Sequence, residues 1–155
     1  MTKRFEDYFS GLQADMVAVC LEYVGHDAEE IYIYGSYEPE MYAFDVFYKL
    51  NGRVLQKHEL NDDPILTHTQ RFDLSEKRQE AVLNEGLALL EALHQQCIAF
   101  GREMPTEMKL VYDVKNNSLK GTYLYDLVYS HDDSMLPDDV FELWIAEVKR
   151  EKLKG

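Results

Sequence analysis

A chain of 155 residues suits one globular domain, and its 46% hydrophobic and 29% charged residues exclude a disordered protein. Its formal net charge of −13 repels nucleic acid and anionic membranes, so neither is an expected partner. No apolar run reaches the roughly 20 residues that span a bilayer, and the charged first residues do not resemble a signal peptide. These features predict a cytoplasmic protein.

The first part of the chain predicts a helix followed by two strands. Apolar residues recur at spacings of three and four over 5–23, which indicates an amphipathic helix, and Gly25 is suited to end it. The segment 31–39 is rich in β-branched and aromatic residues, and 41–50 alternates between two faces. Both are expected to be strands of one sheet.

A hairpin is predicted directly after these strands. Asn51-Gly52 tolerates the positive φ values of a tight type I′ turn, so 53–60 is expected to return as the partner strand. The polar segment 61–70 contains a proline and is expected to be a loop.

The rest of the chain predicts the longest helix, a second hairpin and a last helix. These elements are expected over 73–100, 106–129 and 137–152. Asp73 and Glu76 have the spacing of a capping box, and Pro137 is suited to the first position of a helix. Helices that alternate with hairpins predict the α+β class. We expect a single domain over 1–155, with an antiparallel sheet of about four to six strands and three helices packed on it.

The chain contains eleven tyrosines, and most of them lie on predicted strands. Tyrosine suits the half-buried face of a sheet, and any tyrosine that points outward would suit a protein partner or a homodimer. Stacking of RNA bases on such a sheet needs a basic surround, and this chain is acidic. Nucleic acid is therefore not expected as a ligand.

The acids are concentrated in two segments that contain no lysine or arginine. Ten acids lie between Arg4 and Lys49 and seven between Lys120 and Lys149, and these account for 17 of the 29 acids. Ordinary protein surfaces mix charges of both signs. We therefore expect an acidic surface that attracts a basic partner.

The stretch "YSHDDSMLPDD", residues 129–139, is the best candidate for chemistry in this chain. His131 and its neighbouring aspartates are acceptable metal ligands, but consecutive residues do not converge on one ion in regular structure. Asp138 and Asp139 suit the first turn of a helix, where the helix dipole favours anions, and Asp132 suits a turn. No nucleotide-binding, hydrolase or metalloprotease motif is present. We predict no catalytic, metal or cofactor-binding residue.

Residues 104–148, "MPTEMKLVYDVKNNSLKGTYLYDLVYSHDDSMLPDDVFELWIAEV", resemble the C-terminal half of the YezG-like immunity proteins. These are bacterial antitoxins that neutralise secreted polymorphic toxins, many of which are nucleases. The matching features are Pro105-Thr106, the strand that ends at Asp113, the turn at Asn116-Asn117, Tyr125-Asp126, Pro137 and Trp144. The resemblance implies an immunity protein that uses no cofactor and that binds and occludes a basic toxin.

The resemblance and the charge distribution together assign the toxin-binding surface to acids of the second block. The predicted partner-binding residues are Asp126, Asp132, Asp133, Asp138, Asp139 and Glu142. Two alternatives remain open from the residues alone. One is a metal-dependent enzyme or metal-binding regulator that uses His131 and the aspartates beside it, and the other is an acidic adaptor or scaffold protein.

Overall fold

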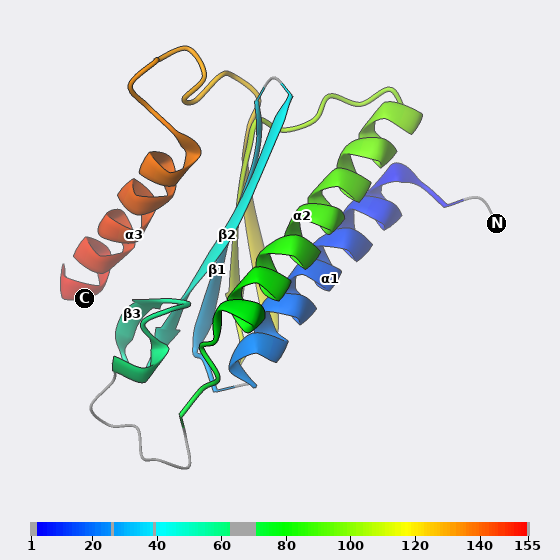
Figure 1. The fold of residues 1–155 in the computed structure, drawn as a ribbon. Helices are drawn as coiled ribbons and strands as arrows, with labels where there is room; N and C mark the ends of the chain where they lie inside the picture. Colours follow the sequence, from blue (N-terminus) through cyan, green and yellow to red (C-terminus); the bar gives the residue numbers. More distant parts are fainter. Residues whose placement is uncertain (1–2, 26, 39, 63–70, 155) are drawn as a thin grey trace.

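The computed structural model describes residues 3–25, 27–38, 40–62 and 71–154, and its centre is a five-stranded antiparallel sheet (Figure 1). The sheet has the order β3-β2-β1-β4-β5. Its strands are β1 (Glu30–Glu38), β2 (Met41–Leu50), β3 (Arg53–Gln56), β4 (Glu107–Asp113) and β5 (Ser118–Leu124). A short 3₁₀ helix, η1 (Leu60–Asp62), follows β3. Five strands fall within the predicted number.

Three helices cover the sheet from two sides. Helices α1 (Phe5–Val24) and α2 (Glu76–Ala99) pack together on one face, and α3 (Pro137–Lys154) lies on the other (Figure 1). This arrangement confirms the predicted α+β class, with N-terminal, long central and C-terminal helices. No helix in the described ranges combines the length and the apolar character that crossing a bilayer requires.

The central strand β1 is buried on both faces because helices cover both sides of it. Ile31 and Ile33 join the core under α1 and α2, whereas Tyr32 and Tyr34 join the core under α3. Successive side chains therefore point to opposite faces of the sheet, as in any strand, but both faces are buried. An exposed surface of strand tyrosines, one reading of the sequence, is thus ruled out for these two positions, each at most 3% exposed.

Helix α3 is attached to the sheet through aromatic side chains. Tyr32 and Phe47 stack with ring centroids 4.5 Å apart, and Trp144 meets Phe47 edge-on at 5.0 Å. Such pairs contribute about 0.5–1.5 kcal/mol each beyond the burial of their area. The main contacts of α3 are with β2 and β3, so the β4–β5 side of this face is more open.

Turn chemistry explains where the first hairpin begins and why it is short. Asn51 and Gly52 have φ values of 50° and 78°, which confirms the predicted tight turn. The returning strand ends at Gln56 rather than at residue 60, because the backbone N–H of Gln56 donates to Oε1 of Glu59 at 2.9 Å. That bond closes a local turn in place of further pairing. The expected loop at 61–70 lies outside the described residues from 63 onward.

Helix α2 begins two residues later than the capping-box prediction requires. Its N-cap is Ser75, whose hydroxyl accepts the N–H of Arg78. Asp73 instead accepts the N–H of Ser75 at 3.1 Å. The capping-box prediction was therefore wrong, because the upstream aspartate serves the cap residue rather than the helix itself.

The second hairpin is also shorter than predicted. Strand β5 ends at Leu124 rather than at residue 129. Beyond it, the backbone N–H groups of residues 128–130 bond to the Glu38 side chain and not to a neighbouring strand. The chain thus leaves the sheet and forms a loop, residues 125–136, that leads to α3.

Candidate functional site

The loop at 125–136, which carries half of the predicted partner-binding acids, is fixed to the sheet by the side chain of Glu38. Oε1 of Glu38 accepts the N–H groups of Val128 and Ser130 at 3.0 Å each and the hydroxyl of Ser130 at 2.7 Å. The N–H of Tyr129 lies 3.2 Å from both carboxylate oxygens. Glu38, at the end of β1, is only 1% exposed. One buried carboxylate therefore holds three successive backbone amides.

These bonds also set the protonation of Glu38. Burial alone would raise the pKa of this carboxyl, but the amides of 128–130 and the Ser130 hydroxyl together outweigh burial and lower the pKa below its usual range. The carboxylate form is thus the form that binds the loop. Tyr129, 2% exposed, adds a contact of 3.2 Å between its hydroxyl and that of Ser36. The loop is consequently preorganised against β1.

The second half of the loop is shaped by one aspartate of its own and by one in the first turn of α3. Oδ1 of Asp132 accepts the N–H of Ser134 at 2.9 Å and its hydroxyl at 2.7 Å, and these two bonds lower the pKa of Asp132. Oδ2 of Asp139 accepts the N–H of Leu136 at 2.8 Å, just before Pro137 begins α3. The predicted turn and the predicted helix start are therefore both confirmed.

The neighbouring aspartates of α3 provide a matched test of this cap. Asp139→Ala should lower the free energy of unfolding by roughly 0.5–1 kcal/mol more than Asp138→Ala. Both variants remove one charge near the helix N-terminus, but only Asp139 bonds to a backbone N–H before it. Urea denaturation of the two variants measures the difference, and equal midpoints would contradict the role of Asp139 as a cap.

All six predicted partner-binding acids are exposed, and they divide into two groups. Asp132 and Asp139 are engaged in the local bonds just described. The side chains of the other four form no hydrogen bond or ion pair among the described residues: Asp126, Asp133, Asp138 and Glu142. Three of the six lie on the loop and three on the first turns of α3, and within the described part of the chain no bond joins one of them to another. These four are the acids that are free to meet a partner.

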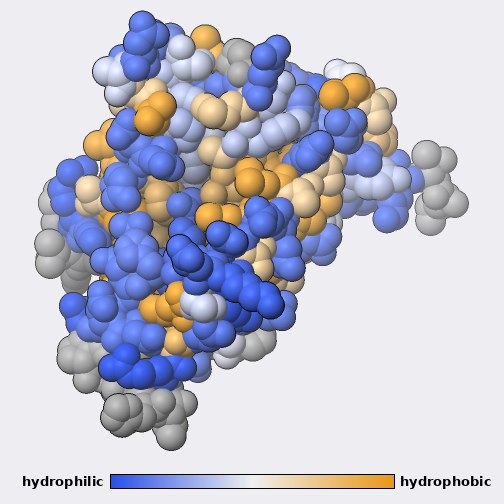
Figure 2. Space-filling view, in the orientation of Figure 1, coloured by the Kyte–Doolittle hydropathy of each residue, from blue (hydrophilic) through white to orange (hydrophobic). Residues whose placement is uncertain are grey.

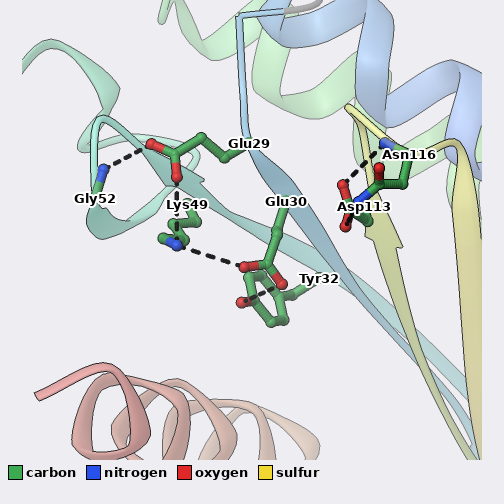
Figure 3. Close-up of polar contacts among 7 residues, drawn as sticks. All are labelled: Glu29, Glu30, Tyr32, Lys49, Gly52, Asp113 and Asn116. Carbon is green, nitrogen blue, oxygen red and sulfur yellow. Dashed lines mark hydrogen bonds and ion pairs between the residues drawn. The ribbon is translucent and has the colours of Figure 1, made fainter. Parts of the chain in front are cut away.

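The first acidic block differs, because several of its carboxylates are neutralised within the chain. Lys49 lies 3.3 Å from Glu29 and 3.6 Å from Glu30, as Figure 3 shows. The same close-up shows the N–H of Gly52 donating to Glu29 at 2.7 Å and the hydroxyl of Tyr32 donating to Glu30 at 3.1 Å. These acids brace one end of the sheet.

Two further acids of the first block form ion pairs with cations of the described residues. Glu6 lies 3.2 Å from Arg102, and Asp45 lies 3.0 Å from Lys57. Within the part of the chain that the structure describes, no acid between Lys120 and Lys149 forms an ion pair. The two blocks look alike in sequence, but among the described residues ion pairs neutralise acids of the first block and none of the second.

Exposed apolar side chains lie among the acids of this surface, and the sequence reasoning missed them. Leu127, Leu136 and Leu143 are 48%, 60% and 59% exposed. The space-filling view shows hydrophobic patches scattered over a mostly hydrophilic face of the molecule (Figure 2). Leu143 could have been found, because it falls outside the apolar stripe of α3. Exposed leucines beside these acids offer apolar contact area to a protein partner.

His131, the centre of the metal alternative, is exposed and lies in the turn that Asp132 organises. The carboxylate of Asp132 already accepts two hydrogen bonds from Ser134. Among the residues that the structure describes, no group of three or more His, Cys, Asp or Glu side chains is arranged to hold a metal ion. No observation here favours a metal site over a protein-binding surface.

No protein-family model matches the chain, and no curated protein matches it in sequence. The resemblance of residues 104–148 to the YezG-like immunity proteins stays a prediction from the quoted motifs. The surface combines exposed leucines with acids that form no ion pair among the described residues, on a loop and a helix that Glu38 and the α3 aromatic residues hold in place.

Proposed function

We propose that this protein is a non-catalytic immunity protein that binds a basic toxin domain, such as a nuclease, and occludes its active cleft. The observation that carries the proposal is the second acidic block, which forms no ion pair among the described residues and is exposed on an anchored loop and the start of α3. A nuclease must present positive charge to bind phosphates. An acidic surface of matching shape competes for that cleft without any chemistry of its own.

The two kinds of residue on this surface have different physical roles. The free acids raise the rate of encounter, because long-range attraction between opposite charges speeds association by about 10- to 1,000-fold at low salt. The exposed leucines add apolar contacts from which water is displaced on binding. Such contacts mainly slow dissociation and so lengthen the lifetime of the complex. Anchoring by Glu38 reduces the entropy lost on binding, because the loop is already ordered.

The test uses the protein encoded beside the gene of this chain as the binding partner. Neutralising the free acids, as Asp126→Asn, Asp133→Asn, Asp138→Asn and Glu142→Gln together, should slow association about 10-fold at low salt. The measurement is stopped-flow or surface plasmon resonance over a range of salt concentrations. Leu136→Ala with Leu143→Ala should instead speed dissociation and leave association nearly unchanged.

The matched control removes the same charge from the opposite side of the sheet. Asp15→Asn, Glu22→Gln, Glu85→Gln and Glu91→Gln change exposed acids on α1 and α2. These four changes should slow association much less, because they lie on the far face from α3 (Figure 1). Equal effects of the two sets would mean that net charge alone matters and that the α3 side is not the binding surface.

The proposed location follows from the proposed partner. A nuclease toxin meets its substrate in the cytoplasm, so the protein that neutralises it is proposed to act there. If the neighbouring gene product does not bind at all, the adaptor interpretation replaces the immunity function. The acidic surface described above would then serve a different basic protein.

A further inference from the structure

The two edges of the sheet are not equivalent. Strand β3 forms one edge and is only 4 residues long, whereas β5 forms the other edge and has 7 residues. Every residue of β5 except Tyr123 is exposed, and no strand within the described residues pairs with its outer side. Natural proteins shorten, charge or cover an edge strand, because unpaired backbone groups are a template for another strand. Strand β5 is neither short nor covered by α3.

The charge of the β4–β5 hairpin indicates which kind of chain can pair with the free edge of β5. The β4–β5 hairpin, residues 107–124, contains three lysines and two acids in a chain whose net charge is −13. Two copies of such an acidic chain repel each other over most of their surfaces. They can approach at this hairpin with little repulsion, whereas a basic partner is not attracted to it. A second copy of the chain is thus the occupant that fits this edge.

The sequence of β5 is also compatible with pairing to itself. Antiparallel pairing about Gly121 places Lys120 opposite Thr122, so no like charges meet directly. The same register places Leu119 opposite Tyr123 and Leu124 opposite Ser118. Leu119 and Leu124 are large apolar side chains, 37% and 44% exposed, and this pairing would cover part of both.

We propose that two copies of the protein associate through β5, in antiparallel register about Gly121, and join their sheets into one. This dimer does not rest on the proposed immunity function, because the residues on β5 are not those of the acidic surface on 125–136 and α3. Either proposal can fail without the other.

The first test is the mass of the purified protein as a function of concentration. Analytical ultracentrifugation should detect a species of twice 18.1 kDa. In the proposed register, Thr122→Glu places a glutamate opposite Lys120 of the other copy, and Thr122→Lys places a lysine there. The first should tighten and the second weaken the dimer, with dissociation constants that differ roughly 10-fold. Thr122 also neighbours Lys109 on β4, so thermal unfolding of both variants checks that the fold is intact.

The second test fixes the register. Lys120→Cys and Thr122→Cys chains should form a disulfide-linked dimer when they are mixed and oxidised, whereas neither should cross-link efficiently alone. The native cysteines, Cys20 and Cys97, are buried and do not compete. A protein that stays monomeric at its highest soluble concentration would overturn the proposal. So would a dimer whose affinity does not respond in opposite directions to the two Thr122 variants.

Discussion

Replacing Gly86 with alanine should destabilise the protein by about 1–3 kcal/mol, although alanine normally favours the interior of a helix. A Cβ atom at Gly86 would lie 2.2 Å from the ring of Phe44, which is 6% exposed and packed in the core. Phe44 belongs to β2, and its ring lies in the close-packed core against α2, so the ring cannot move away at low cost. Gly86 therefore lets α2 approach the sheet closely.

Gly11, in α1, is the matched control for this substitution. A Cβ atom at Gly11 meets nothing within 4 Å, so Gly11→Ala should stabilise the protein by up to about 1 kcal/mol. The two variants make the same chemical change in a helix and should shift the urea midpoint in opposite directions. Stabilisation by both would contradict the close packing of α2 on β2.

Replacing Glu38 with glutamine should lower the free energy of unfolding by about 2–3 kcal/mol at neutral pH. The amide group presents only one acceptor oxygen, and its NH₂ group faces the N–H of Tyr129, a donor that it cannot satisfy. Because the carboxylate that residues 128–130 share is replaced by a neutral and weaker acceptor, their amide protons should also exchange faster with solvent. Glu40→Gln removes the same charge at an exposed position two residues away and should change little.

The pH dependence of this effect has a defined sign. The pKa of Glu38 is lowered in the folded state, so its contribution is complete above the pKa of an unfolded glutamate, about 4.3. That contribution is lost as the pH falls through the folded pKa. The stabilities of the wild-type protein and Glu38→Gln should therefore converge in acid. A difference that stays constant from neutral to strongly acidic pH would show that the carboxylate does not hold the loop.

Local signals in the sequence were sufficient for most of the fold. Asn51 and Gly52 tolerate the positive φ values that a tight turn requires, so this pair predicts the turn, and Pro137 predicts the start of α3. Periodic apolar residues then identify the face of each helix that packs on the sheet. Element ends were less predictable, because they depend on single side-chain bonds such as Glu59 to the N–H of Gln56.

The sequence predicted which acids of the candidate site are exposed, but not which of them form ion pairs or what holds the loop in place. The exposure of its acids follows from composition, but their freedom from ion pairs depends on which cations the fold brings near, as Lys49 is brought to Glu29 and Glu30. The anchoring by Glu38 joins residues about 90 positions apart, and no local pattern reports a contact of that range. Glu38 looks in the sequence like one more surface acid.

Amide hydrogen exchange can locate the surface on which a basic partner binds, which we propose to be the α3 side of the sheet. The protein is measured alone and in complex with the neighbouring gene product. We predict slower exchange in residues 126–136 and in the first turns of α3, with the outer surfaces of α1 and α2 unchanged. Protection confined to α1 and α2, with none in 126–136, would show that the partner does not bind on the α3 side.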